Sequence, residues 1–179
     1  MKLFFSLMFF SFCLLSFSHG AISVNLIRNT CKKASQSDPK LSFNFCVASL
    51  RRNPKSQTAD LQELGVISME LAIANATSTS SSISKLLKNK KLDPFTSICL
   101  KDCLGLYLDA VPTLKDAIED FKTRDFYVAN VGVSSAMEAS STCEDGFKEK
   151  EGAVSPLKKE DRDFFQLNAI ALAIINMFH

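Results

Sequence analysis

The sequence has few of the residues on which enzymes and nucleic-acid-binding proteins rely. Its 179 residues include no Trp, two His, six Gly and five Pro. So little Gly and Pro, in a chain that is 46% hydrophobic, argues against a many-turned β-sandwich and against a disordered polymer. The 21 basic and 19 acidic residues form no long run of one sign, so nothing in the charge points to a nucleic-acid partner. A chain of this length folds as one modest domain.

The first twenty residues have the pattern of a secretion signal. A short positive start precedes an almost unbroken apolar run over residues 3–17, and small residues follow at positions 18 and 20. The run of about 15 apolar residues is shorter than the roughly 20 that a membrane span needs. We therefore expect a signal peptide at residues 1–20, cleavage after Gly20, and a mature domain of residues 21–179 that is secreted and free of the membrane. Secretion also makes Asn75, in the sequon Asn75-Ala76-Thr77, a candidate glycosylation site.

The mature chain lacks the groups that most catalytic sites need. Its only histidine is His179, the last residue, so Ser-His and Cys-His nucleophile systems are not expected. A zinc site needs four converging ligands, and Cys99 with Cys103 offers two at most. The sequence has no glycine-rich phosphate loop. We therefore expect no enzymatic activity, no metal and no cofactor.

Apolar residues recur every three or four positions in four long segments, a pattern typical of amphipathic helices. These segments run from about Thr58 to Leu87, from Pro94 to about Lys122, from Phe126 to Phe147 and from about Pro156 to Phe178, and Asp93, Asp125 and Ser155 stand before three of them as N-caps. Two shorter helical segments, around residues 24–35 and 41–51, precede them. The sequence predicts an all-α protein, an up-down-up-down four-helix bundle at about 57–178 with an N-terminal helical hairpin at about 24–52.

Two local features disturb this helical pattern. Residues 77–82 are all Ser or Thr, whose hydroxyls compete for the helix backbone, so the first bundle helix is expected to be continuous but locally weak. Pro112 lies inside the second bundle helix, where it removes one backbone donor and crowds the carbonyl of Leu108. A kink is expected at that point.

Five cysteines remain after signal cleavage, and secretion makes disulfides the expected state of most of them. Cys31 and Cys46 lie on the two arms of the short hairpin, where a bridge closing a loop of about 15 residues contributes about 3 kcal/mol in the chain-entropy model. Cys143 can be reached by Cys99 or Cys103, which are four residues apart on one helix face. Cys103 and Cys143 are equally far in sequence from the turn between their helices, which favours Cys103 as the partner of Cys143. Cys99 is then a free, buried and inert thiol.

Several segments resemble the plant invertase inhibitor and pectin methylesterase inhibitor family, over essentially the whole mature chain. They include Thr30-Cys31, Phe45-Cys46, Leu100-Lys101-Asp102-Cys103 and Thr142-Cys143-Glu144-Asp145-Gly146-Phe147. Within that family, residues 56–62, 64–68 and 143–148 look most like the pollen allergens of plane trees. The resemblance implies a bridge in the hairpin, Cys31 with Cys46, and a bridge between the second and third bundle helices, Cys103 with Cys143. It also implies an apoplastic inhibitor that binds a cell-wall carbohydrate enzyme one to one.

The resemblance leaves two candidate partners, a pectin methylesterase and an acid invertase. Some invertase inhibitors carry a Pro-Lys-Phe motif at the start of the third bundle helix, where this chain has Phe126, Tyr127 and Val128 instead. The pectin methylesterase inhibitors bind through helix faces that span the substrate cleft of the enzyme. We therefore expect Phe126, Tyr127, Val128 and Thr142 as candidate target contacts of a monomeric inhibitor. The alternative is a secreted helical bundle that inhibits nothing, such as a pollen allergen, a signalling protein or an interaction protein.

Overall fold

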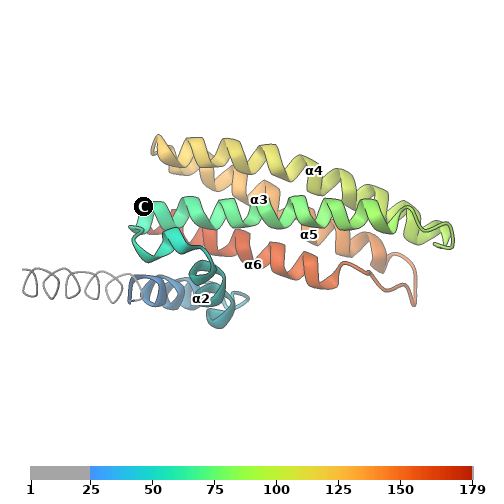
Figure 1. Ribbon diagram of the computed structural model, residues 1–179, viewed down its shortest axis with the longest axis horizontal. Helices are drawn as coiled ribbons and strands as arrows, with labels where there is room; N and C mark the ends of the chain where they lie inside the picture. The colour runs from blue at the N-terminus through green and yellow to red at the C-terminus, as the bar shows by residue number, and fades with distance from the viewer. Residues whose placement is uncertain (1–24, 179) are drawn as a thin grey trace, which may run out of the picture.

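The computed structural model describes residues 25–178, so the expected signal peptide and His179 lie outside the described residues. All regular secondary structure within 25–178 is helical. Residues 25–37 form a helix, followed by α2 (Phe43–Arg52), the 3-10 helix η1 (Pro54–Gln57), α3 (Leu61–Leu86), α4 (Pro94–Lys122), α5 (Phe126–Lys148), α6 (Lys158–Ile175) and the 3-10 helix η2 (Asn176–Phe178). Figure 1 shows the four long helices side by side as an elongated bundle, with the N-terminal hairpin beneath one end. The predicted all-α fold is confirmed.

The bundle closes because each long helix packs against two others. α4 lies between α3 and α5, and α6 completes the ring by contacting the same two helices. The predicted apolar stripes face the interior, where the largest fully buried side chains include Tyr107, Phe121, Phe147 and Phe164. Burial of these faces supplies the main stabilisation of the bundle.

Short polar contacts define where the bundle helices begin. Asp60 and Glu63 form a reciprocal capping box at the start of α3, with both hydrogen bonds at 2.8 Å. The predicted caps Asp93 and Asp125 accept hydrogen bonds from backbone N–H groups of α4 and α5. Each of these three helices therefore starts with a carboxylate near its positive dipole end.

The expected start of the last helix is wrong by two residues. Ser155 was expected to cap a helix beginning at Pro156, but α6 begins at Lys158 and has no side-chain cap. The Ser155 hydroxyl instead accepts a hydrogen bond from the backbone N–H of Leu157 at 3.0 Å, which holds a turn ahead of the helix. A hydroxyl that closes such a local turn is no longer available as a helix cap.

Neither expected weak point interrupts its helix. In α3, the hydroxyl of Thr77 donates to the carbonyl of Ile73 at 2.8 Å, and that of Ser80 donates to the carbonyl of Ala76 at 2.9 Å. These bonds engage helix carbonyls and leave α3 continuous. α4 also continues through Pro112. Proline has no N–H to donate to the carbonyl of Leu108, but Leu108 is exposed, so water can reach that carbonyl. The kink expected at Pro112 stays a prediction.

Two disulfides join the helices, and both are between the expected cysteines. Cys31 is bonded to Cys46 and links residues 25–37 to α2, while Cys103 is bonded to Cys143 and links α4 to α5. Cys99 is free and buried. Burial, followed by the negative charge of Asp102, raises the pKa of the Cys99 thiol and so favours its protonated form.

Gly65 marks the closest approach of α3 to the aromatic core. A Cβ atom at this position would lie 2.6 Å from Cε1 of Phe121 and 3.2 Å from Cγ2 of Ile174. Phe121 has no room to yield, because it is fully buried and meets Phe126 and Phe178 edge to face. Only glycine fits there without displacing the ring.

We predict that Gly65→Ala lowers the free energy of unfolding by about 1–3 kcal/mol, the usual cost of overpacking a core. The matched control is Gly105→Ala on α4, where an added Cβ meets nothing within 4 Å. That variant should gain up to about 1 kcal/mol from helix propensity. Denaturant unfolding curves measure both. Equal midpoints for the two variants would show that the approach of α3 to Phe121 is not tight.

Candidate functional site

The outward face of α5 carries two of the four predicted contact residues on one line. Five residues spaced alternately three and four positions apart form one stripe along the helix: Val128, Val131, Ser135, Glu138 and Thr142. All five are exposed. Val128 and Thr142 are about 21 Å apart along the axis at 1.5 Å per residue. We call these five residues the α5 stripe.

In the first turn of α5, Tyr127 is exposed to solvent, whereas Phe126 packs into the bundle. Tyr127 is 75% exposed and lies beside the α5 stripe, one turn before Val131, which is 52% exposed. Phe126 instead packs inward, with its ring stacked on Phe178 at 5.0 Å and edge to face with Phe121 at 5.5 Å. The exposed apolar surface is therefore made by Tyr127, Val128 and Val131, and Phe126 mainly supports it from below.

A row of carboxylates on α4 borders the α5 stripe. Gly132 of α5 approaches Thr113 and Ala117, so the Thr113 edge of α4 faces α5. Four aspartates lie at helical spacing on that same edge, and we call them the acidic row: Asp102, Asp109, Asp116 and Asp120. Neither Val131 nor the acidic row was predicted from the sequence. The seven-residue spacing of Asp102, Asp109 and Asp116 was a signal that could have found the row.

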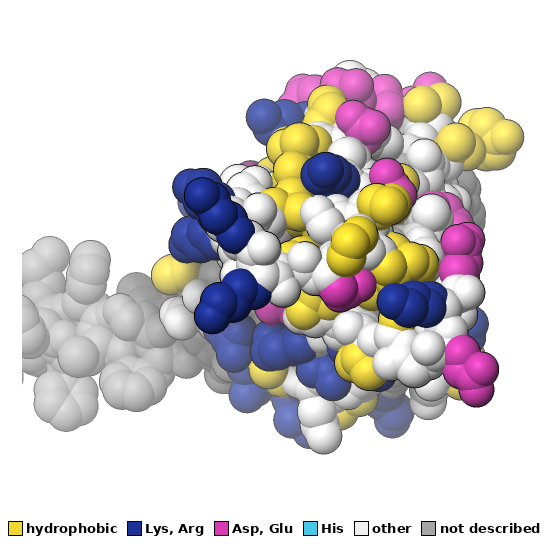
Figure 2. Space-filling model, turned by 90° about the vertical axis from the view of Figure 1, so that its right-hand side faces the viewer, with side chains coloured by type: hydrophobic (Ala, Val, Ile, Leu, Met, Phe, Trp, Pro, Cys, Tyr) yellow, Lys and Arg dark blue, Asp and Glu magenta, His cyan; other side chains and the backbone are white. Residues whose placement is uncertain are grey.

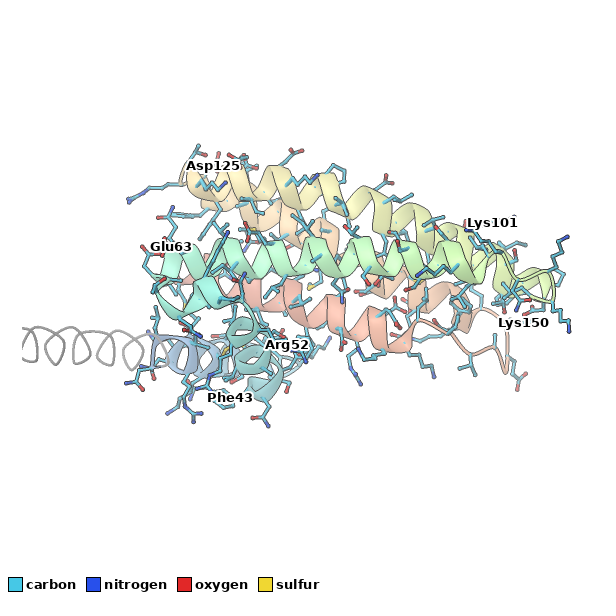
Figure 3. All side chains as sticks on the ribbon, viewed as in Figure 1. Phe43, Arg52, Glu63, Lys101, Asp125 and Lys150 are labelled. Carbon is cyan, nitrogen blue, oxygen red and sulfur yellow. A yellow bond between two sulfur atoms is a disulfide. The ribbon has the colours of Figure 1, made fainter. Side chains whose placement is uncertain are left out.

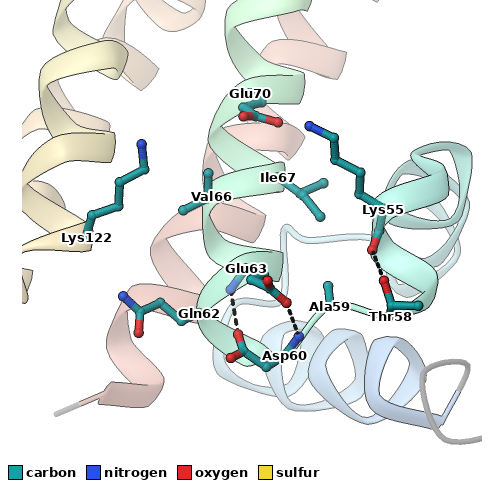
Figure 4. A pocket seen from close by; sticks show the side chains of 10 residues that line it. All are labelled: Lys55, Thr58, Ala59, Asp60, Gln62, Glu63, Val66, Ile67, Glu70 and Lys122. Carbon is teal, nitrogen blue, oxygen red and sulfur yellow. Dashed lines mark hydrogen bonds between the residues drawn. The ribbon is translucent and has the colours of Figure 1, made fainter. Parts of the chain in front are cut away.

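An open groove of about 560 Å³ lies on a different side of the bundle, over the first half of α3. Figure 4 shows Lys55 of η1 and Lys122 of α4 on either side of it. Asp60, Glu63 and Glu70 give it a charged lining, with Val66 and Ile67 on its floor. An open, charged groove of this kind does not suit a carrier of apolar small molecules, which bury most of their surface in a pocket.

Tyr107 and Asp161 form a buried polar pair whose geometry indicates a structural role. The Tyr107 hydroxyl donates to Oδ1 of Asp161 at 2.6 Å, and both residues are buried. Burial raises the pKa of Asp161 to about 7, with a smaller rise from Glu144 and Glu160, while the hydrogen bond from Tyr107 opposes it. Burial and the Asp161 charge raise the pKa of Tyr107, so its hydroxyl keeps its proton. Sγ of Cys143 lies 3.9 Å from Oδ2 in a simple contact, since a disulfide sulfur carries no hydrogen.

The described residues also bear on metal binding, membrane insertion and glycosylation. No group of three or more His, Cys, Asp or Glu within residues 25–178 could hold a metal ion. None of the helices in this part of the chain has both the length and the apolar character needed to cross a bilayer. Asn75 of the sequon is half-buried on α3, and its Oδ1 is buried without a hydrogen-bond partner among the described residues.

Comparison with known proteins agrees with this architecture. The sequence model of the family described as "Plant invertase/pectin methylesterase inhibitor" matches residues 25–174. The chain is 50% identical to "Putative invertase inhibitor" of Platanus acerifolia, over 99% of this chain and 98% of that protein. It is 38% identical to "Pectinesterase inhibitor 12" of Arabidopsis thaliana, over 99% of each.

The fold is also similar to a solved structure of this kind. A crystal structure of a mutant form of a pectin methylesterase inhibitor from Arabidopsis superposes with a TM-score of 0.66 at 26% identity, over 80% of this chain and 96% of that one. These relatives are named as inhibitors and not as enzymes, in agreement with the scarcity of catalytic groups. The chain belongs to the plant invertase/pectin methylesterase inhibitor family.

Proposed function

We propose that the mature protein is a secreted inhibitor that binds a plant cell-wall enzyme, a pectin methylesterase or an acid invertase, one to one and blocks its active site. The observation that carries this proposal is the exposed apolar surface of Tyr127, Val128 and Val131 on a rigid helix of a family of inhibitors. Exposed aromatic and branched apolar side chains gathered at one place are typical of protein interfaces.

The shape of this face suits occlusion of a cleft. α5 is a helix of 23 residues, and the Cys103–Cys143 bridge ties it to α4, so the two helices are held together as one face. A face held in this way can cover a substrate cleft without any change in its own backbone, which lowers the entropic cost of binding. No group of the inhibitor needs to take part in a reaction. An interface of standard size buries about 1,600 Å² in total, more than Tyr127 and its two neighbours can supply.

The acidic row extends the same face and adds charge selectivity. Asp102, Asp109 and Asp116 are exposed and form no ion pair among the residues that the structure describes. Unpaired carboxylates beside an apolar patch favour a partner with a basic rim around its cleft and speed the encounter. Inhibition should therefore weaken as salt concentration rises.

The test titrates the purified mature chain against a plant pectin methylesterase and an acid invertase in parallel. Methanol release and sucrose cleavage report the two activities from mildly acidic to neutral pH. We predict that Val131→Glu raises the inhibition constant by at least about 30-fold, because a central contact contributes about 2 kcal/mol. The matched control, Val154→Glu, makes the same change at a valine that is 67% exposed on the loop before α6 and should leave inhibition unchanged.

Two results would contradict the proposal. If the natural sequence inhibits neither enzyme while circular dichroism shows an intact bundle, the protein is a secreted bundle with another role. If Val131→Glu and Val154→Glu weaken inhibition equally, the interface lies elsewhere on the molecule. Inhibition of one enzyme and not the other identifies the target.

The proposal includes secretion into the apoplast as a monomer without bound metal or cofactor. It places the cleavage after Gly20, the hairpin at about 24–52 and the bundle at about 57–178 of the mature chain. It also includes an N-glycan at Asn75, which would be added to the nascent chain before α3 packs. The intact mass of the secreted protein tests both the cleavage site and the glycan. The measured chain should begin at Ala21, and its mass should fall on enzymatic deglycosylation.

A further inference from the structure

The charges of the molecule are distributed very unevenly between the hairpin and the bundle. Residues 25–57 contain seven basic side chains and one acidic side chain, whereas residues 58–178 contain thirteen basic and eighteen acidic ones. Taken together with η1, which follows it directly, the hairpin thus carries a net charge of +6 and the bundle −5. The balanced composition of the whole chain hides this separation. The seven are Arg28, Lys32, Lys33, Lys40, Arg51, Arg52 and Lys55.

These seven cations are available for an external partner. All of them are exposed, and none forms an ion pair within the described part of the chain, where every ion pair belongs to the bundle. Asp38 is the single carboxylate within residues 25–57, and Lys55 also borders the groove that Asp60, Glu63 and Glu70 line. Seven exposed cations against one carboxylate in 33 residues produce a positive local potential, which is strongest away from that groove.

The hairpin holds these cations on a rigid support. The Cys31–Cys46 bridge joins its two helices, and the Arg28 guanidinium lies 5.5 Å from the centre of the Phe43 ring. The loop between the helices is fixed to α6 by Gln166, whose Oε1 accepts from the Ser42 N–H at 2.8 Å and whose Nε2 donates to the Lys40 carbonyl at 2.6 Å. Because the hairpin is already held in place, binding carries no entropic cost for ordering it.

The surface lacks what a protein interface needs at its centre. The large exposed apolar side chains of the described residues all lie in the bundle, and none lies in residues 25–57. A stable protein interface usually has an apolar or aromatic core, and membrane docking also relies on inserted apolar side chains. A surface of exposed Lys and Arg without apolar anchors is instead suited to a polyanion, which binds by releasing counterions.

We propose that the hairpin is a second binding surface, distinct from the α5 stripe, that holds a linear polycarboxylate polysaccharide. The assignment of the ligand rests on the proposed function, because a pectin methylesterase hydrolyses a methyl ester with water to methanol and a carboxylate. The polymer therefore gains negative charge wherever such an enzyme has acted. Bound to it, the inhibitor is concentrated beside its target.

The hairpin and the α5 stripe can be occupied together. α2 packs mainly against α3 and α6, whereas the acidic row and the α5 stripe lie on α4 and α5. In Figure 3, Arg52 and Phe43 of the hairpin lie across the bundle from Asp125, the residue that caps α5. A polymer on the hairpin would leave the proposed inhibitory face open.

The test measures binding of the mature chain to polygalacturonate and to the fully methyl-esterified polymer by calorimetry. The acidic polymer should bind and the neutral one should not, and the dissociation constant should rise at least about tenfold between 50 and 200 mM salt. Lys32→Glu with Lys33→Glu should weaken binding by about tenfold or more, since it reverses two of the seven charges. Inhibition of the target enzyme on a small soluble ester should not change, which separates this proposal from the proposed function.

A matched control lies at the other end of the bundle. Lys88 and Lys90 belong to a second group of exposed lysines after α3, at the end that Figure 2 views, where basic side chains gather on one side and acidic ones on the other. Lys88→Glu with Lys90→Glu changes the net charge equally and should leave the affinity within about twofold, because screening confines the effect of a charge to about 10 Å.

Three results would overturn the proposal. Absence of binding to polygalacturonate would exclude it directly, and equal loss in both double variants would show that only net charge matters. Equal or tighter binding to phosphatidylserine vesicles or to a second copy of the chain, measured by sedimentation at the same salt, would assign the hairpin to a membrane or to self-association.

Discussion

Asp161→Asn is expected to remove most of the pH dependence of stability between about pH 4 and about pH 7. The Asp161 carboxyl is buried beneath α4, and Glu144 and Glu160 add negative charge around it. Lys159 and Arg162, two cations on its own helix, pair with Asp163 instead. Burial therefore dominates and raises the pKa of Asp161 to about 7.

The direction of the effect follows from which state holds the proton. Between about pH 4 and about pH 7 the folded protein keeps Asp161 protonated, whereas the unfolded chain has lost that proton. Raising the pH through this range therefore favours unfolding, by as much as about 4 kcal/mol in total. Above that range both states are ionised and the contribution is constant. The protein should be most stable in the acidic range.

Urea unfolding at a series of pH values measures this contribution. Asn keeps an acceptor for the Tyr107 hydroxyl but cannot ionise, so the variant should be more stable than the natural sequence near pH 7.5 and similar to it near pH 4. Asp163→Asn, two residues along the same helix, removes a half-buried carboxylate that pairs with Lys159 and Arg162, and it should keep the natural pH dependence. Parallel curves for Asp161→Asn and the natural sequence would refute the role of Asp161.

The second large effect is expected from the bridge between α4 and α5. Cys103→Ala with Cys143→Ala opens a loop of 40 residues and should lower the free energy of unfolding by about 4 kcal/mol in the chain-entropy model. For a domain of this size that corresponds to a fall in Tm on the order of 10 °C. Both cysteines are replaced because Cys99 lies one turn from Cys103 and could pair with a Cys143 left alone.

The hairpin bridge and the free thiol supply the comparison. Cys31→Ala with Cys46→Ala opens a loop of 15 residues and should cost about 3 kcal/mol, with the loss felt first in the hairpin. Cys99→Ala should cost about 1 kcal/mol, since it removes one buried sulfur and no cross-link. Peptide mapping without reduction should recover Cys99 unpaired. A loss of less than 1 kcal/mol for the Cys103 and Cys143 pair would mean that packing alone holds α4 to α5.

Local patterns predicted the helices well because helical periodicity depends on residues that are close in sequence. The stripe from Ala129 to Phe147 is buried as expected, Phe126 at its start is half-buried, and Asp93 and Asp125 cap their helices. Equal distance from a turn selected Cys103 over Cys99 as the partner of Cys143, because antiparallel helices bring equidistant residues together. The start of α6 was misplaced because Ser155 had two local hydrogen-bonding options, and the turn was the one formed.

The sequence by itself determined the helical bundle, the family and the absence of a catalytic histidine from residues 25–178. Tertiary structure decided which side of each helix faces solvent, and so separated Phe126 from Tyr127, placed Val131 beside the acidic row and buried Asp161. It also fixed the loop of the basic N-terminal hairpin, whose cations are already neighbours in the sequence, to α6 through Gln166. Periodicity depends on covalent neighbours, whereas the burial and potential of a charged group depend on which distant elements pack around it.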